Sequence, residues 1–257
     1  PHAEPASMEW MLLHSEHTQR QIERIRAEHR EIEADRPAVT VTHVTGSAHE
    51  ANASPDPSYR YVRIDDVSPW VVRAVLTAED GDFFFYGGVN PVTLADAIES
   101  NLAAGEIVYG ASTISMQLVK MLFLDQDRVF SRKLQEVFLV YLMEHHVPVS
   151  KERILELYLN LAEFGPGIYG IHRAAGYYFN KEPRELTAGE ATWLASILPA
   201  PKTYHRYYEE GEISDGWFAR MIGLYDIMLE RGRMTPAEYE EALRRRPVFA
   251  SSPGDEE

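Results

Sequence analysis

The sequence contains no cysteine, which excludes both a disulfide framework and a thiolate metal site and leaves the redox compartment open. It also lacks any run of about 18 apolar residues, the length that a membrane-spanning helix needs. Lys and Arg number 25 against 40 Asp and Glu, giving a formal net charge of −15. That balance argues against broad nucleic-acid binding. With 45% hydrophobic residues in 257 positions, the chain can still form one sizeable core.

Composition divides the chain into three parts. Residues 1–58 predict a helix over 8–34, a short Val/Thr strand near 39–45 and a proline-containing linker. Residues 59–248 form the main domain, whose periodicity is helical and predicts roughly eight helices from residue 68 onward. Residues 249–257 predict a disordered acidic tail. Because the chain starts at Pro1 without a signal peptide, we expect a portion of a longer protein whose membrane anchor is absent.

A cluster of cations stands out on this acidic chain. Residues 117–133 hold four cations against two aspartates, a local excess that predicts an anionic ligand. Gln117 and Lys120 are three residues apart and share a helix face, and Ser112-Thr113 would offer hydroxyl and backbone donors at a turn. These groups could together hold a pyrophosphate. The four cations are Lys120, Arg128, Arg132 and Lys133.

Glu79 follows an apolar helical run and precedes the aromatic run 83–86. A carboxylate beside so many aromatic rings is poorly solvated, which raises its pKa and suits a general base near neutral pH. The alternative is that Glu79 merely ends a helix. The residues alone leave both interpretations open.

Arg132 and Glu136 lie four residues apart on a second predicted helix. They therefore share one face, and such a pair is usually a surface ion pair. We expect the apolar face of this helix to consist of Leu134, Val137, Phe138 and Tyr141.

Two other motifs resemble ligand sites only superficially. The segment 165–170 matches G-x-G-x-x-G, but it follows a helical pattern, whereas a dinucleotide site needs a preceding strand. We interpret it as a glycine turn that permits close packing. His145 and His146 are adjacent on a helix, point about 100° apart and cannot chelate as an i,i+4 pair does.

These blocks, in order, resemble peptidoglycan glycosyltransferase family 51, which comprises the transglycosylase domains of penicillin-binding proteins and the monofunctional biosynthetic transglycosylases. The resemblance runs from about Tyr59 to Leu243. Its motifs are Ala78-Glu79-Asp80 with Phe83 and Gly88, Gly110-Ala111-Ser112-Thr113-Ile114-Ser115 with Gln117 and Lys120, Arg132-Lys133 with Glu136, Lys151 with Ile154-Leu155-Glu156-Leu157-Tyr158-Leu159-Asn160 and the glycine turn, and Ala174-Ala175 with Tyr178-Phe179.

The resemblance implies a mainly α, lysozyme-like bilobal domain with a small membrane-facing jaw, to which Phe123, Leu124 and Phe130 would contribute. It implies that a growing lipid-linked glycan is transferred, with inversion, onto the 4-hydroxyl of lipid II as undecaprenyl pyrophosphate leaves. The implied location is the periplasmic face of the bacterial inner membrane. The implied partners are lipid II, the growing glycan, the membrane surface and other cell-wall synthesis proteins, and no nucleic acid.

The same resemblance assigns roles. Glu79 and Glu136 would be the catalytic residues, Glu79 as general base. Glu136 would position Arg132 or Lys120, or hold a divalent cation (Mg²⁺ or Mn²⁺) against the phosphates. No dedicated metal site and no required cofactor are predicted. The predicted substrate-binding residues are Asp80, Ser112, Thr113, Gln117, Lys120, Arg132, Lys133 and Lys151.

Two other functions fit parts of the sequence. Tyr86, Met116 and Met121 stand where the family usually carries polar residues, which fits a module that binds the lipid-linked glycan and polymerises poorly. The fold would also accommodate a hydrolase that uses Glu79 as general acid. A hydrolase gains nothing from a cationic pyrophosphate site, so Lys120 and Arg132 argue against it.

Overall fold

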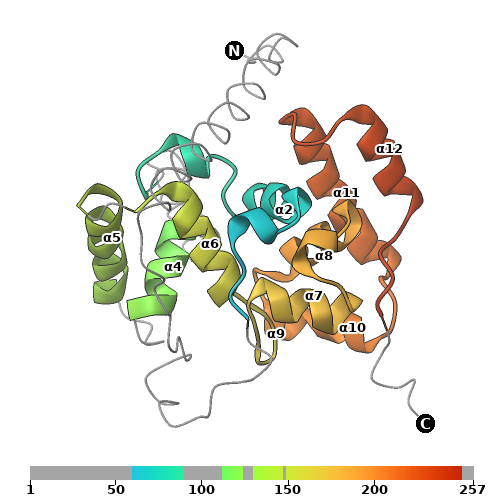
Figure 1. Cartoon of the computed structure of the whole chain (residues 1–257), viewed down its shortest axis with the longest axis horizontal. Helices are drawn as coiled ribbons and strands as arrows, with labels where there is room; N and C mark the ends of the chain where they lie inside the picture. The colour runs from blue at the N-terminus through green and yellow to red at the C-terminus, as the bar shows by residue number, and fades with distance from the viewer. Residues whose placement is uncertain (1–59, 90–111, 124–129, 147–148, 251–257) are drawn as a thin grey trace.

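The computed structural model describes residues 60–89, 112–123, 130–146 and 149–250, without the side chains of 130–134. The predicted helix, strand and linker of residues 1–58 lie outside these ranges, as do residues 251–257. Helices dominate the described chain (Figure 1), which confirms the predicted mainly α class.

In chain order the described elements are η1 (Ile64–Asp66), α2 (Pro69–Glu79), η2 (Phe83–Phe85), α4 (Ile114–Phe123), α5 (Phe130–His145), α6 (Lys151–Leu161), β1 (Glu163–Gly165), β2 (Ile168–Tyr169), α7 (Ile171–Phe179), η3 (Pro183–Glu185), α8 (Ala188–Ile197), α9 (Pro201–Tyr204), α10 (Arg206–Glu209), α11 (Asp215–Glu230) and α12 (Pro236–Arg244). The sequence predicted fewer helices because α9 and α10 are single turns, too short to show a helical period.

Side-chain caps set where several helices begin. The Ser68 hydroxyl accepts a hydrogen bond from the backbone N–H of Trp70 at the start of α2, and Pro69 occupies the first helical position. Thr235 and Glu238 form a reciprocal capping box at the start of α12. Ser68 and Pro69 fix the start of α2, and Glu79 lies at the other end of that helix.

The main core surrounds α2 and α8, which lie side by side near the centre of Figure 1. α8 is buried on every side, and α2 buries Val71, Ala74 and Val75 completely. Each valine buried in this way contributes about 1.5–3 kcal/mol relative to exposure. The last turn of α2 is therefore held on a rigid support.

Phe249 also belongs to this core. Its ring is 8% exposed, stacks on Phe179 and meets Trp193 edge-on. The N–H of Ala250 donates to the Tyr178 carbonyl at 3.0 Å. The predicted boundary at residue 248 was wrong for this reason: an aromatic residue just before the acidic tail covers the edge of the core. The folded domain extends to residue 250.

A second, smaller apolar cluster joins α4 and α5, at the left of Figure 1. Met116, Val119 and Val140 form its buried centre. The predicted apolar face of α5 is right at Val137, which packs on this cluster, and wrong at Phe138 and Tyr141, which are 60% and 51% exposed. The position of α4 decides which face of α5 turns inward, and residue type alone does not reveal it.

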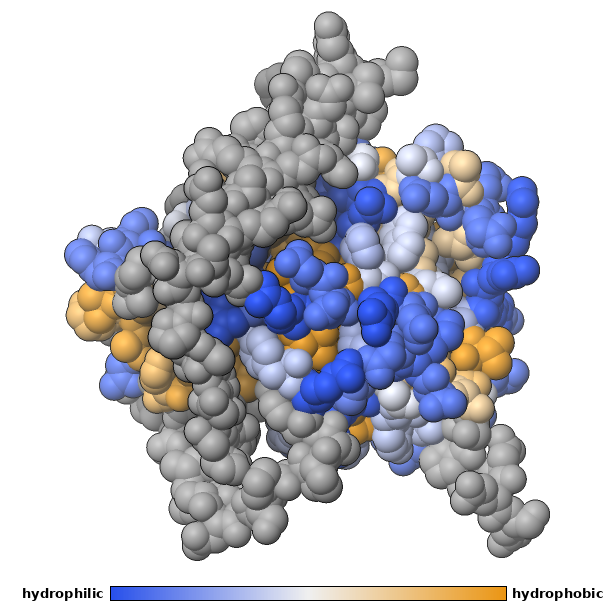
Figure 2. All heavy atoms as spheres, viewed as in Figure 1, coloured by the Kyte–Doolittle hydropathy of each residue, from blue (hydrophilic) through white to orange (hydrophobic). Residues whose placement is uncertain are grey.

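Hydrophilic residues cover much of the described surface in Figure 2, whereas an orange group marks the edge formed by α5. Phe123, one of the predicted jaw residues, is 65% exposed. Leu124 and the side chain of Phe130 lie outside the described part. In the ranges that the structure describes, no helix has the length and apolar content to cross a membrane.

The glycine segment forms a hairpin. β1 and β2 pair antiparallel, with Gly167 at φ +71° between them. A Cβ at Gly165 would lie 2.3 Å from the Tyr178 hydroxyl, so glycine permits a close approach there. The dinucleotide interpretation is wrong, because this segment lies in a two-stranded antiparallel hairpin and not in a parallel βαβ unit.

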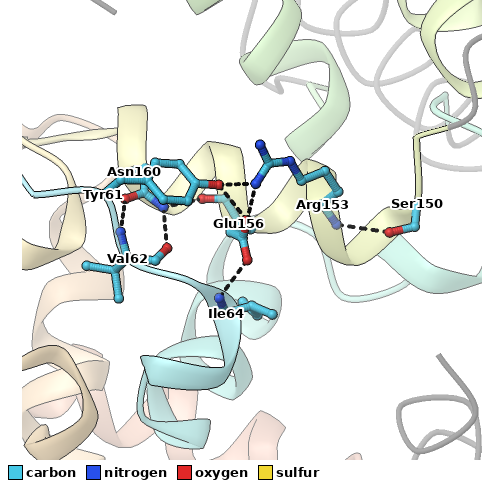
Figure 3. Close-up of polar contacts among 7 residues, drawn as sticks. All are labelled: Tyr61, Val62, Ile64, Ser150, Arg153, Glu156 and Asn160. Carbon is cyan, nitrogen blue, oxygen red and sulfur yellow. Dashed lines mark hydrogen bonds and ion pairs between the residues drawn. The ribbon is translucent and has the colours of Figure 1, made fainter. Parts of the chain in front are cut away.

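The chain before α2 is fastened to α6 by a polar network (Figure 3). The Glu156 carboxylate accepts hydrogen bonds from the Tyr61 hydroxyl, the Arg153 guanidinium and the N–H of Ile64, the last at 2.7 Å. The Asn160 amide exchanges two 2.8 Å hydrogen bonds with the backbone of Val62. The motif Leu155 to Asn160 thus has a structural role here.

Candidate active site

Glu79 lies at the C-terminal end of α2, where α4 and α6 approach. Its Oε2 accepts a 2.7 Å hydrogen bond from the Gln117 amide. Its Oε1 is shielded from solvent and has no hydrogen-bond partner among the described residues. Burial raises the pKa of Glu79; the bond from Gln117 opposes this rise and the charge of Asp80 adds to it. The direction agrees with the sequence prediction.

Gln117 is itself held from the far side. Its side-chain carbonyl accepts a hydrogen bond of 3.3 Å from the hydroxyl of Tyr158, a buried residue of α6. That contact orients the amide so that its NH₂ group faces Glu79. Three helices therefore fix one carboxylate oxygen and leave the other available.

Asp80 fastens the end of α2 to the start of α4. Its Oδ2 accepts hydrogen bonds from the N–H of Ile114, at 3.0 Å, and from the Tyr86 hydroxyl. Burial raises the pKa of Asp80, and these two bonds counteract part of the rise. The carboxylate also lies at the positive end of the α4 dipole.

Lys151 lies beside this pair on the first turn of α6. Its Nζ is 2.8 Å from Glu144 Oε1 and lies over the rings of Phe83 and Tyr86, at 4.4 and 4.9 Å from their centroids. Burial lowers the pKa of Lys151, and the bond to Glu144 opposes that effect. The site thus contains a sheltered cation close to Asp80.

The other predicted residues of α4 differ in exposure. Thr113 is buried, and its hydroxyl caps α4 by accepting from the Met116 N–H at 3.1 Å while donating to the Gly88 carbonyl at 2.6 Å. Ser112 and Lys120 are exposed. Their contact with substrate stays a prediction.

Glu136 lies on the inner face of α5 and is 3% exposed. It shares that face with Val140 and Glu144, one and two turns further on. Glu136 is therefore not at the surface, and its pairing with Arg132 stays a prediction. The side chains of Arg132 and Lys133 lie outside the described part.

Met116, Met121 and Tyr86, which stand where the family usually carries polar residues, differ in exposure and contacts. Met116 is 1% exposed and belongs to the small apolar cluster, whereas Met121 is 39% exposed. Tyr86 keeps a polar contact, because its hydroxyl donates to Asp80. Only Met121 is open to solvent without a polar group.

Sequence reasoning missed several supporting residues. Tyr158 was seen only as part of a helical motif, and Glu144 was assigned no role. Arg220 also acts on Glu79, because its positive charge lowers the pKa of that carboxyl. The contacts join distant parts of the chain, and a single sequence carries no signal for them.

Comparison with known proteins gives the family. Residues 47–222 match the family described as Transglycosylase. The chain belongs to this family. It is 38% identical over 185 residues to "Penicillin-binding protein 1A" of Aquifex aeolicus, covering 72% of this chain and 25% of that protein. It is 41% identical over 148 residues to "Biosynthetic peptidoglycan transglycosylase" of Ralstonia nicotianae, covering 58% of this chain and 62% of that protein.

Among solved structures, the chain is similar to penicillin-binding protein 1A from Haemophilus influenzae, with a TM-score of 0.42 and 19% identity. That match covers 76% of this chain and 19% of the other. The chain spans 25% and 62% of the lengths of the two curated relatives named above.

Proposed function

We propose that this domain polymerises peptidoglycan glycan strands. It would transfer a lipid-linked glycan onto the 4-hydroxyl of lipid II and release undecaprenyl pyrophosphate. The observation that carries the proposal is the Glu79 carboxylate, half-buried at a helix end, oriented by Gln117 and left with one oxygen without a hydrogen-bond partner among the described residues. Membership of the Transglycosylase family supports it.

The chemistry needs a base on the acceptor side. As the acceptor 4-oxygen attacks the anomeric carbon of the donor, its proton passes to Glu79 and the bond from that carbon to the pyrophosphate oxygen breaks. Burial raises the pKa of Glu79, which strengthens it as a base in its ionised form. The Oε1 atom is the acceptor for this proton.

Negative charge then accumulates on the departing pyrophosphate. Lys151 is the described cation best placed to act on it, because Glu144 and two aromatic rings fix its position. Lys120, Arg132 and Lys133 would complete the cationic surface, with Ser112 supplying a hydroxyl. Such preorganised charge is worth most where water is excluded.

A divalent cation, Mg²⁺ or Mn²⁺, would assist only as a counter-ion of the pyrophosphate. In the part of the chain that the structure describes, no three His, Asp or Glu side chains are arranged to hold a metal. The protein would therefore supply few ligands, with Glu136 the foremost, and phosphate oxygens the rest. Polymerisation that is unaffected by a chelator would contradict this part of the proposal.

We also propose that the domain works at the periplasmic face of the inner membrane. The exposed apolar residues of α4 and α5, among them Phe123 and Phe138, support contact with the membrane surface. Lipid II and the growing glycan would be reached from that surface. Other cell-wall synthesis proteins would be further partners of the whole protein.

The test is polymerisation of lipid II by membrane-reconstituted protein, comparing wild type with Glu79→Gln. We expect polymer from the wild type and a loss of roughly 10²- to 10⁴-fold in the variant. Glu240→Gln, the same change at an exposed residue of α12, is the matched control and should retain full activity. If neither wild type nor variant forms polymer but both bind lipid II, the binding-module alternative is correct.

A further inference from the structure

The turn between α11 and α12 lies against the segment that carries Glu79. Arg233, in this turn, is half-buried and donates two hydrogen bonds. Its Nη1 donates to the Thr77 hydroxyl at 2.8 Å, and its Nη2 donates to the Gly81 carbonyl. Thr77 precedes Glu79 by two residues and Gly81 follows it by two. One guanidinium therefore spans the turn that contains Glu79 and Asp80.

Both acceptors of Arg233 are themselves fixed in position, so the two hydrogen bonds restrain the turn. The Thr77 hydroxyl donates to the Arg73 carbonyl at 2.7 Å, so its lone pair faces Arg233 in a fixed direction. The Gly81 carbonyl lies just beyond the end of α2, where no helical N–H remains to bind it. The planar fork of arginine suits two acceptors at once, whereas a lysine ammonium is a single point charge.

Arg231 covers the same turn from outside. A Cβ at Gly81 would lie 2.5 Å from its Nη1 and 2.9 Å from its Cζ, so the guanidinium fills the space of a side chain at position 81. Its Nη1 also pairs with Asp82 Oδ1 at 2.9 Å. The Arg231 guanidinium thus packs directly on the backbone of Gly81 and adds a second contact between the α11–α12 turn and the end of α2.

We propose that Arg233 is a positioning residue for the proposed transfer reaction, because it holds the Glu79–Asp80 turn so that the Glu79 carboxylate stays aimed at the acceptor hydroxyl. This inference rests on the proposed function. A displacement of about 1 Å at a catalytic group can cost as much as a hundredfold in rate. A purely structural bond would instead change the folded fraction and leave the rate per folded molecule intact.

The surroundings of Arg233 are unfavourable for its positive charge. Burial, together with the nearby charge of Arg231, lowers the pKa of Arg233 to about 10, and the charges of Asp82 and Asp80 oppose this shift. The guanidinium remains charged at neutral pH. A buried cation held beside another cation is a poor choice for stability alone.

The experiment compares Arg233→Met and Arg233→Lys with wild type in lipid II polymerisation, normalised to folded protein. We expect Arg233→Met to lower kcat by roughly tenfold to a hundredfold, with KM changed less than about twofold, and Arg233→Lys to recover part of the loss. The acid side of the pH profile should move to lower pH, because a loosened turn admits water to Glu79. Arg245→Met removes the same charge from an exposed side chain and should leave all three quantities unchanged.

Hydrogen exchange at the amides of residues 79–82 separates this inference from the proposed function. We expect faster exchange in Arg233→Met than in wild type and no change in Arg245→Met. Unchanged exchange, or an unchanged kcat per folded molecule in an active enzyme, overturns the positioning role. Absence of polymer from the wild type overturns the proposed function instead. The exchange rates then decide on their own whether Arg233 holds the Glu79–Asp80 turn.

Discussion

Glu79 and Glu156 are both shielded carboxylates on helices, and their surroundings differ in one respect. Both oxygens of Glu156 accept hydrogen bonds, from Tyr61, Arg153 and the backbone of Ile64. Glu79 has Gln117 on one oxygen and, among the described residues, nothing on the other. A carboxylate with both oxygens satisfied joins parts of a fold, whereas one with a free oxygen is able to accept a proton.

The neighbouring charges strengthen this contrast. Glu156 is paired with a guanidinium on its own helix. Glu79 is adjacent to Asp80, whose charge raises the pKa of Glu79 further. The fold therefore tolerates an unfavourable arrangement at Glu79 that it avoids at Glu156. Such local frustration is typical of catalytic groups.

The largest effect on stability is expected at Glu156. Glu156→Gln replaces an acceptor-only group with one that also carries donors, which leaves the Tyr61 hydroxyl and Arg153 poorly matched. We expect a loss of about 2 kcal/mol and a fall in Tm of roughly 4–8 °C, measured by thermal unfolding. The rate per folded molecule should change little. An unchanged Tm would mean that the network in Figure 3 contributes no net stability.

The next effect concerns the pH dependence of activity. The hydrogen bond from Gln117 lowers the pKa of Glu79, so Gln117→Ala should raise that pKa and move the acid side of the pH profile to higher pH. A hydrogen bond to a charged group is worth about 1.5–3 kcal/mol, so activity on the acid side should fall roughly tenfold or more. Gln135→Ala, at an exposed position of α5, is the control. A profile that does not move would show that Gln117 does not tune Glu79.

The smallest effect is on the stability of Glu79→Gln. Because the pKa of Glu79 is raised in the folded state, its contribution to stability is fully present below the unfolded pKa and is lost as pH rises through the folded pKa. Relative to wild type, Glu79→Gln should therefore gain stability as pH rises toward neutral. Chemical unfolding at several pH values measures this, and a difference that shrinks with rising pH contradicts it.

The sequence predicted the parts of the site that depend on local order. The apolar run before Glu79 predicted that this residue ends a helix, as the structure shows for α2, and the segment 165–170 is not a dinucleotide site, as predicted. Local rules failed where packing partners decide. The inward face of α5 carries Glu136 instead of Phe138, because α4 covers that side.

Long-range contacts lay beyond sequence reasoning altogether. Gln117 meets Glu79 across 38 positions, and Arg233 meets Gly81 across 152. Neither separation follows from helical periodicity, since the fold alone sets which helix ends meet. The proposed general base could thus be nominated from its neighbours in the sequence, but the groups that orient it could not.

The most direct test places Glu79→Gln and Glu156→Gln side by side in one measurement of lipid II polymerisation, each normalised to the folded fraction. If Glu79 is the base and Glu156 a structural link, Glu79→Gln loses at least a hundredfold in rate per folded molecule. Glu156→Gln keeps the wild-type rate in the same measurement. Equal losses in the two variants, or near wild-type polymerisation by Glu79→Gln, would contradict the account.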